Sequence, residues 1–229
     1  MAKNLLVCGF GPGISHAVAE KFGAAGFAVG LVARNRERLE AGVKALAGKG
    51  VKAHAFAADL SDLDAIPGLV ESARKAMGPL TVLQWSAYAT GAGDLLQADR
   101  KELETVLRVP TASLLTAIRA ALPDLRAQKG ESAVLVTNGG LGYFDASMDK
   151  IAVEWNAMGL AVANAAKHKI VGMLAHKLAA DGIYVGEIMV QGTVKGTAFD
   201  KGNATLDAAR IADKFWDIYK ARTPASIGF

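Results

Sequence analysis

The 229-residue sequence predicts an α/β protein with a doubly wound, mostly parallel central sheet and helices on both faces. Short runs rich in Val, Leu and Ile alternate six times with longer, Ala-rich segments of helical period. The short runs are apolar almost throughout, as in strands that are buried on both faces. No linker, composition break or internal repeat divides the chain. We therefore expect a single domain over residues 1–229.

Glycine and proline stand at several joins between the predicted elements, where turns favour them. The predicted strands are Leu5–Cys8, Ala28–Ala33, Val51–Ala57, Leu80–Ser86, Ala133–Thr137 and Ile183–Val190. The predicted helices are Ile14–Ala25, Arg36–Ala47, Leu63–Met77, Arg100–Arg126, Ile151–Ala180 and Asp207–Arg222. In doubly wound sheets ligands bind beyond the carboxyl ends of the strands. We expect the functional residues just after those ends.

The composition excludes several classes of protein. With 52% hydrophobic and 21% charged residues, the chain is not of the disordered type. We see no apolar run near the roughly 18–20 residues of a membrane-spanning helix and no signal-cleavage pattern, so we expect a cytoplasmic protein without a membrane partner. A single cysteine, Cys8, excludes a disulfide framework and a multi-cysteine zinc site, and no metal is expected. A net charge of +4 without a basic stripe argues against nucleic-acid binding.

The first predicted turn carries a candidate cofactor site. Glycines here allow a tight turn and let backbone N–H groups approach a pyrophosphate, to which the following helix adds a partial positive charge. Ser15 stands where many such turns have a third glycine, and it can cap the helix or donate to a phosphate. The residues that we assign to this part of the site are Gly9, Phe10, Gly11, Pro12, Gly13, Ile14 and Ser15.

The end of the second predicted strand indicates which dinucleotide is bound. Sites for NAD usually have an acid here, whereas an arginine accommodates the 2′-phosphate of NADP. This chain has Arg34 and Asn35 and no acid at that position. NADP(H) is therefore the expected cofactor, the alternative being that the arginines at 34, 36 and 38 only form the solvated start of a helix.

With these motifs the chain resembles the short-chain dehydrogenase/reductase family over nearly its whole length, with the Rossmann-like domain that this implies. The turn at Gly9-x-x-x-Gly13 is similar to the family's cofactor turn, and Asp59-Leu60 to its adenine contact. Gly192 matches the glycine of the family's Pro-Gly motif, which would bring the segment after it against the nicotinamide. The remaining cofactor residues that this implies are Ser86, Ala87, Tyr88, Thr137, Val194 and Thr197.

The predicted reaction centre departs from that family. Gly139 falls at the place of the catalytic Ser, and Pro110 at or near that of the Asn. Counting back from Gly182 puts Leu160 and Asn164 at the Tyr and Lys positions, whereas a three-residue shift puts Ala163 and Lys167 there. Neither choice supplies a tyrosine, because none occurs between Tyr143 and Tyr184. The usual Asn-Ser-Tyr-Lys tetrad is expected to be missing.

Other groups are needed if a carbonyl is to be reduced, since the developing alkoxide needs a proton donor. Tyr143 follows the fifth predicted strand and Tyr88 ends the fourth, so both are candidates; the alternative for Tyr143 is a loop aromatic that packs over the pocket. His168 and His176 are interpreted as surface or interface residues, being eight positions apart rather than four.

Two functions remain open. The first is an NADP(H)-dependent oxidoreductase acting on a small carbonyl, alcohol or enoyl substrate with an unconventional proton donor. The second is a catalytically inactive relative that binds NADP(H) as a sensor, scaffold or partner subunit. Because the predicted helices at 100–126 and 151–180 are Ala- and Leu-rich around much of their surface, we expect a homodimer or homotetramer.

Overall fold

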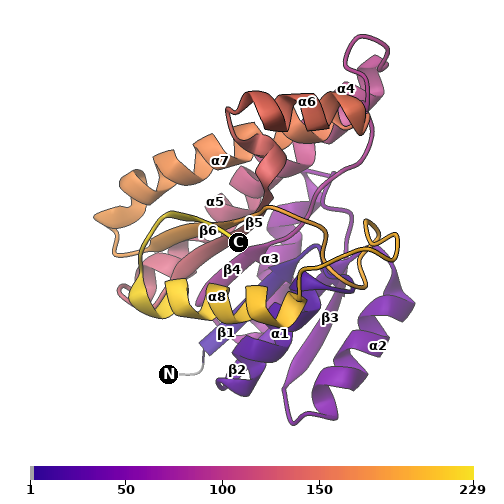
Figure 1. Ribbon diagram of the computed structural model, residues 1–229. Coiled ribbons are helices and arrows are strands. Elements are labelled where there is room, and N and C mark those ends of the chain that lie inside the picture. The colour runs from indigo at the N-terminus through magenta and orange to yellow at the C-terminus, as the bar shows by residue number, and fades with distance from the viewer. Residues whose placement is uncertain (1–2) are drawn as a thin grey trace.

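A computed structural model describes residues 3–229, so residues 1–2 of the predicted domain lie outside the described part. It contains a seven-stranded parallel sheet in the order β3-β2-β1-β4-β5-β6-β7 (Figure 1). The strands are β1 Lys3–Cys8, β2 Phe27–Ala33, β3 Ala53–Ala57, β4 Val82–Trp85, β5 Ala133–Gly139, β6 Tyr184–Val190 and β7 Ser226–Gly228. This confirms the predicted doubly wound fold.

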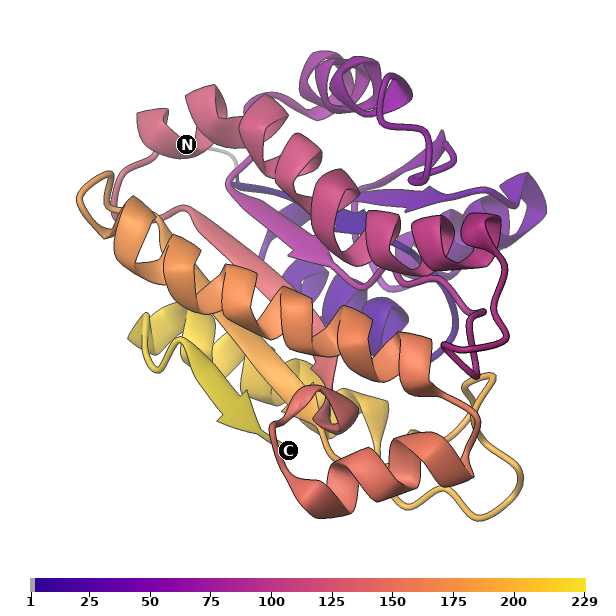
Figure 2. The same ribbon diagram turned by 90° about the horizontal axis from the view of Figure 1, so that it is seen from above.

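Helices cover both faces of the sheet (Figures 1 and 2). On one face lie α1 (Ile14–Ala24), α2 (Arg36–Ala47) and α8 (Ala208–Ala221). On the other lie α3 (Ala65–Met77), α5 (Leu114–Ala127) and α7 (Met158–Ala179), and Figure 2 shows α5 and α7 side by side across it. The strand order reverses between β1 and β4. In folds of this kind, the crevice at the carboxyl ends of these two strands is where a ligand binds.

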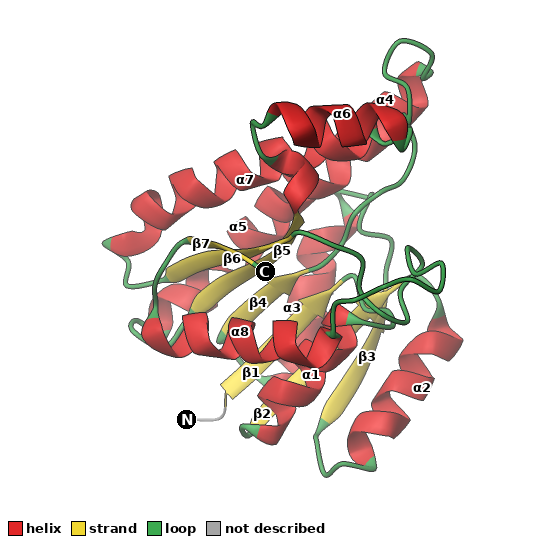
Figure 3. Ribbon diagram, in the orientation of Figure 1, coloured by secondary structure: helices red, strands yellow, loops and turns green. Residues whose placement is uncertain are grey.

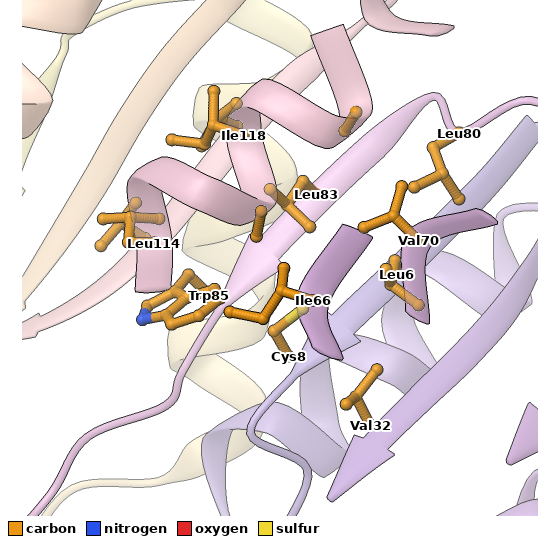
Figure 4. Packing of buried hydrophobic residues seen from close by; sticks show 14 of the residues in the cluster. Leu6, Cys8, Val32, Ile66, Val70, Leu80, Leu83, Trp85, Leu114 and Ile118 are labelled. Carbon is orange, nitrogen blue, oxygen red and sulfur yellow. The ribbon is translucent and has the colours of Figure 1, made fainter. Parts of the chain in front are cut away.

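On each face of the sheet, buried side chains of the strands and of the covering helices form a separate apolar cluster. Figure 4 shows the cluster under α3 and α5, where Trp85 of β4 packs among Ile66, Leu83 and Leu114, all fully or almost fully buried. Because β1, β2, β4, β5 and β6 each contribute side chains to both clusters, these strands are apolar at successive positions. The rigid sheet that results holds its carboxyl edge in place.

The helix predicted at Arg100–Arg126 is a longer helical run with a break. A capping box between Asp99 and Glu102 starts α4 (Arg100–Arg108), and a π-helical turn, η1 (Val109–Ser113), joins it to α5. Pro110 has no N–H to donate, so the regular hydrogen-bond ladder cannot continue through it. Within the described residues this run, Arg100–Ala127, is long and apolar enough to cross a membrane by length and composition, which our expectation from the sequence missed. In the fold it packs on α3 and α7.

Two further details differ from the prediction. The helix predicted at Ile151–Ala180 is divided into α6 (Ala146–Glu154) and α7, because Asn156 has a positive φ of 50° that ends α6. Strand β7 was not predicted, since three residues carry no periodicity; it pairs with β6 at the edge of the sheet (Figure 3). The short 3₁₀ turn η2 (Gly140–Gly142) follows β5 and leads toward α6.

Candidate functional site

A cleft of about 1960 Å³ lies at the carboxyl ends of the strands and is lined by residues that follow each of β1–β6. Most of the predicted site residues contribute to its wall. They are Gly9, Phe10, Gly11, Pro12, Ile14, Ser15, Arg34, Asn35, Asp59, Leu60, Ser86, Ala87, Tyr88, Thr137, Tyr143, Gly192, Val194 and Thr197. Gly13 is not part of the described lining, because it lies under Thr197: a β-carbon on Gly13 would stand 2.6 Å from the threonine methyl.

The turn after β1 lies close against the backbone that follows β4. Gly9 has a φ of +89°, and a β-carbon on it would lie 2.5 Å from the backbone nitrogen of Ala87, so only glycine fits. The N–H groups of Gly9 and Phe10 both donate to the Val32 carbonyl, at 3.1 and 2.7 Å. Beyond the turn, the first N–H groups of α1 have no partner within the helix and remain available to an anion. This cradle fits the pyrophosphate of a dinucleotide.

Ser15 serves the turn itself. Its hydroxyl lies 2.9 Å from the Gly11 nitrogen and 3.0 Å from the Gly11 oxygen, and the side chain is almost wholly buried. No side chain caps α1, which begins after Gly13. The predicted helix-capping role of Ser15 is therefore wrong, and its side chain braces the glycine turn instead.

Two arginines border the cleft where β2 ends. Arg34 and Arg38 both line it and both are exposed, whereas Arg36 is not among the described lining residues. Asn35 is committed to the helix, since its Oδ1 accepts a 2.7 Å hydrogen bond from the Arg38 nitrogen and caps α2. Arg38 reaches over the glycine turn: its Nη1 would lie 4.0 Å from a β-carbon on Gly11. The sequence singled out Arg34 alone, although the i, i+4 spacing could have indicated the pair.

Asp59 supplies a carboxylate to the same end of the cleft. Its Oδ1 accepts hydrogen bonds of 2.9 Å from the Ser61 backbone and 2.8 Å from the Ser61 hydroxyl. These bonds, led by the backbone one, lower the pKa of Asp59, and the charge of Arg34 adds to the effect. Asp59 is therefore ionised at neutral pH and can accept hydrogen bonds from a ligand.

The middle of the cleft has a floor of hydroxyl groups. The Ser86 and Thr137 hydroxyls are 2.8 Å apart, across the ends of β4 and β5. Buried Gln84 donates through Nε2 to both, at 2.6 and 3.0 Å, and so fixes their positions. Such hydroxyls both donate and accept, which suits a sugar or an amide.

Beyond these hydroxyls lie the residues that the sequence alignment assigned to the reaction-centre positions. Gly139, Leu160 and Asn164 all line the cleft. Ala163, which the shifted alignment places at the tyrosine position, belongs instead to a small apolar cluster with Ala92 and Val106. The ungapped alignment therefore describes the cleft-facing side of α7 better, although Lys167, one turn beyond Asn164, lines the cleft as well.

Both candidate tyrosines face the cleft from its walls. The Tyr143 ring packs edge-on against His168, with the centroids 5.9 Å apart. The Tyr88 ring lies 5.8 Å from that of Phe199, and burial raises the pKa of its phenol. The structure thus brings both to the cleft, each in contact with a second ring.

His168, interpreted from the sequence as a surface or interface residue, is hydrogen-bonded to the interior of the protein. Its Nδ1 is hydrogen-bonded to Oε1 of Glu187, a fully buried carboxylate on β6. Asn138 on β5 donates to the other oxygen of Glu187 at 2.8 Å and to the Asn164 carbonyl at 3.1 Å. Sequence reasoning missed this network, because a single acid within an apolar strand shows no spacing pattern.

The mouth of the cleft is apolar and aromatic. Phe144 is 98% exposed and Trp155 66% exposed, and both line the cleft together with Phe199. Large exposed apolar side chains at the rim of a pocket favour binding of an apolar ligand group.

The comparisons with known proteins agree with this geometry. A short chain dehydrogenase of Pseudocercospora fijiensis is 31% identical over 142 residues, 59% of this chain and 45% of that protein. The 3-oxoacyl-[acyl-carrier-protein] reductase of Staphylococcus aureus is 26% identical over 135 residues (58% and 55%), and the sulfoacetaldehyde reductase of Chromohalobacter salexigens 29% over 142 residues (62% and 55%). The matched region spans about half the length of these relatives.

Solved structures show the same fold over almost the whole chain. A short-chain dehydrogenase/reductase from Serratia marcescens has a TM-score of 0.87 at 19% identity, covering 99% of this chain and 96% of that one. An NADPH-bound short chain oxidoreductase from Pseudomonas aeruginosa, described as having an atypical catalytic center, has a TM-score of 0.85 at 21% identity, covering 99% and 94%. The family model for short chain dehydrogenases matches residues 3–205. The chain belongs to the short chain dehydrogenase family.

Proposed function

We propose that this protein is an NADP(H)-dependent oxidoreductase that acts on a small carbonyl, alcohol or enoyl substrate. The observation that carries the proposal is the pair Arg34 and Arg38, which border the cleft beside the glycine turn where an NAD site would have an acid. Solved relatives bound to NADP and NADPH, and curated relatives named as reductases of carbonyl compounds, support it.

The residues of the cleft have distinct roles in this proposal. The turn at Gly9 holds the pyrophosphate, and the two arginines hold the 2′-phosphate through charge-assisted hydrogen bonds. Ser86 and Thr137 face the nicotinamide half from the floor. When bound, the reduced cofactor supplies the hydride, and the substrate enters through the aromatic mouth.

We infer that the proton donor is not the family's helix tyrosine. Leu160, at that position, has no proton to give, and Gly139 and Asn164 stand where the family has Ser and Lys. Tyr143 is the first candidate for the donor and Tyr88 the second, because both line the cleft. Burial raises the pKa of the Tyr88 phenol, so Tyr88 gives up its proton less readily, and we place it second.

Titration of the purified protein with NADPH and NADH tests the cofactor assignment. Arg34→Ala and Arg38→Ala should each weaken NADPH binding by about tenfold or more, since a hydrogen bond between charged groups contributes about 1.5–3 kcal/mol. NADH binding should change little. Arg36→Ala is the matched control, being the neighbouring arginine outside the described lining. Equal losses for both dinucleotides would contradict the assignment.

A second function is favoured by the same reaction centre. With Gly139, Leu160 and Asn164 in the cleft, the protein would bind NADP(H) without turnover and act as a sensor, scaffold or partner subunit. A screen of NADPH oxidation over ketones, aldehydes and enones separates the two. Tight NADPH binding with no oxidation of any substrate would favour the inactive relative.

A further inference from the structure

One side of α6 forms an apolar wall of the cleft. Phe144, Met148, Ile151 and Trp155, which belong to α6 and its two ends, all line the cleft. Their spacing of three or four residues places them on one side of the helix. We call these four residues the α6 stripe. From Met148 to Trp155 the stripe covers about two turns, roughly 10 Å along the helix axis.

The other sides of α6 have different surroundings. Ala152 is almost fully buried, and α6 packs on α7 and η2. Val153 is 60% exposed and is not among the described lining residues. Asp145 fixes the start of the helix, because its Oδ1 accepts hydrogen bonds from the backbone nitrogens of Ser147, at 2.9 Å, and Met148, at 3.3 Å. The helix is therefore anchored with the α6 stripe, and not Val153, toward the cleft.

Two more aromatic residues line the cleft and lie against each other. Tyr88 follows β4, and its ring is 5.8 Å from that of Phe199, in the segment 193–203 after β6. Figure 2 shows α6 and this segment at the same end of the molecule. The cleft volume of about 1960 Å³ exceeds the roughly 300–1,000 Å³ of an ordinary small-molecule site. The cleft therefore has room for a second ligand of considerable length beside a dinucleotide.

The charges around the cleft disfavour an anion next to the α6 stripe. The basic residues of the described lining are Arg34, Arg38, Lys167 and Lys201. An arginine fork is the usual partner of a ligand carboxylate or phosphate, and both arginines stand at the cofactor end, away from α6. Lys167 is 3% exposed on α7, and Lys201 is an exposed residue of the segment after β6. The α6 wall itself contributes two acids to the lining, Asp145 and Glu154, which would repel a second anion.

We propose that the substrate is a carbonyl compound with an extended, uncharged apolar chain or ring system, and that the α6 stripe binds this apolar part. The inference rests on the proposed oxidoreductase function and names its substrate class. In the reaction, the hydride of NADPH goes to the carbonyl carbon and a proton goes to the oxygen, which gives the alcohol and NADP⁺. The apolar part takes no part in these bond changes. It contributes binding, by about a factor of four for each methylene group that is removed from water.

Binding is tested first, without turnover, through the fluorescence of Trp155. Of the three tryptophans, Trp85 is fully buried and Trp216 packs against Phe22, whereas Trp155 is 66% exposed at the cleft. Straight-chain methyl ketones from 2-butanone to 2-nonanone are titrated into the protein with NADP⁺, which has no hydride to give. We expect the emission to shift to shorter wavelength and Kd to fall about fourfold per methylene group. Trp155→Phe should remove the shift.

The α6 stripe is then tested by polar substitution. Ile151→Gln, or Met148→Gln should that variant not fold, should raise Kd for 2-nonanone by about tenfold and reduce the gain per methylene group, because an amide loses its hydrogen bonds to water there. Val153→Gln is the matched control on the same helix and should change neither value. In NADPH-dependent reduction, Ile151→Gln should act on KM more than on kcat, since it removes binding that is equal in the ground and transition states.

A charged analogue separates this substrate class from an anionic one. 8-Oxononanoate has the same chain and carbonyl group as 2-nonanone but ends in a carboxylate, and it should bind about tenfold more weakly. Equal or tighter binding of 8-oxononanoate would overturn the proposal and indicate an anionic substrate.

Three other outcomes would also overturn it. They are a Kd that does not depend on chain length, equal effects of Ile151→Gln and Val153→Gln, and a fluorescence shift that persists in Trp155→Phe. The proposed function fails separately, if NADPH does not bind or no ketone is reduced. In that case the same titration of the protein without cofactor still tests the α6 stripe.

Discussion

Gly139 at the end of β5 lies directly against Asn164 of α7: a β-carbon on the glycine would stand 2.7 Å from the asparagine Nδ2. The amide thus occupies the space into which a serine at residue 139 would project. A larger residue at 139 therefore requires the Asn164 amide to move.

This relationship predicts that a conventional reaction centre must be rebuilt as a unit. Gly139→Ser, Leu160→Tyr and Asn164→Lys together should raise ketone reduction with NADPH by about a hundredfold over the starting protein, the order expected for general-acid catalysis. Gly139→Ser alone should give no gain, because Asn164 blocks it. The triple variant with Phe instead of Tyr at residue 160 is the control. Equal rates for the two triple variants, with NADPH still bound, would contradict the prediction.

The role of Tyr143 can be separated from its packing. Tyr143→Phe keeps the ring against His168 but removes the phenolic proton, so we expect kcat to fall by about a hundredfold while NADPH affinity is unchanged. Steady-state rates and a cofactor titration measure the two effects. An unaltered kcat would eliminate Tyr143, and Tyr88→Phe would then be the variant to measure.

Burial of Lys167 carries a cost in stability that depends on pH. The pKa in the folded state, about 8, lies below the unfolded value of 10.5, so the folded protein binds the proton less tightly. Lys167→Met should therefore be more stable than the wild type by about 3 kcal/mol below pH 8. The difference should shrink as pH rises from about 8 toward 10.5. Urea unfolding at several pH values measures it, with Lys169→Met as a control that should show no such trend.

The oligomeric state predicted from the sequence can be tested on the helices concerned. Leu107 and Leu115 on α4 and α5, and Val162 and Met173 on α7, are exposed apolar residues, Met173 by 54%. We propose that a second copy of the chain covers them. Light scattering should show a dimer or tetramer, and Met173→Glu should shift it toward the 24 kDa monomer. Leu96→Glu, on the loop before α4, should leave the assembly unchanged; a wild type that is monomeric at micromolar concentration would contradict the proposal.

The sequence predicted what depends on local pattern. Apolar runs alternating with helical segments gave the sheet, and the glycine turn and Arg34 gave the cofactor end of the cleft, because each is encoded by neighbouring residues. It could not place Arg38 over Gly11, since that contact depends on how α2 leaves the sheet. It also missed the hydrogen bond between His168 and Glu187, because β6 and α7 meet only after folding. The break at Asn156 arises from a left-handed residue that no periodicity reveals.

The contact between Gly9 and the Ala87 backbone has a consequence for the kinetics of cofactor binding. The turn is held by the backbone of Ala87 and by two hydrogen bonds to the Val32 carbonyl. The turn itself therefore does not have to become ordered when the dinucleotide binds. The association rate should then be governed by encounter in solution rather than by a conformational step. In stopped-flow mixing experiments, the association rate constant of the dinucleotide should fall in proportion to the viscosity of the solution.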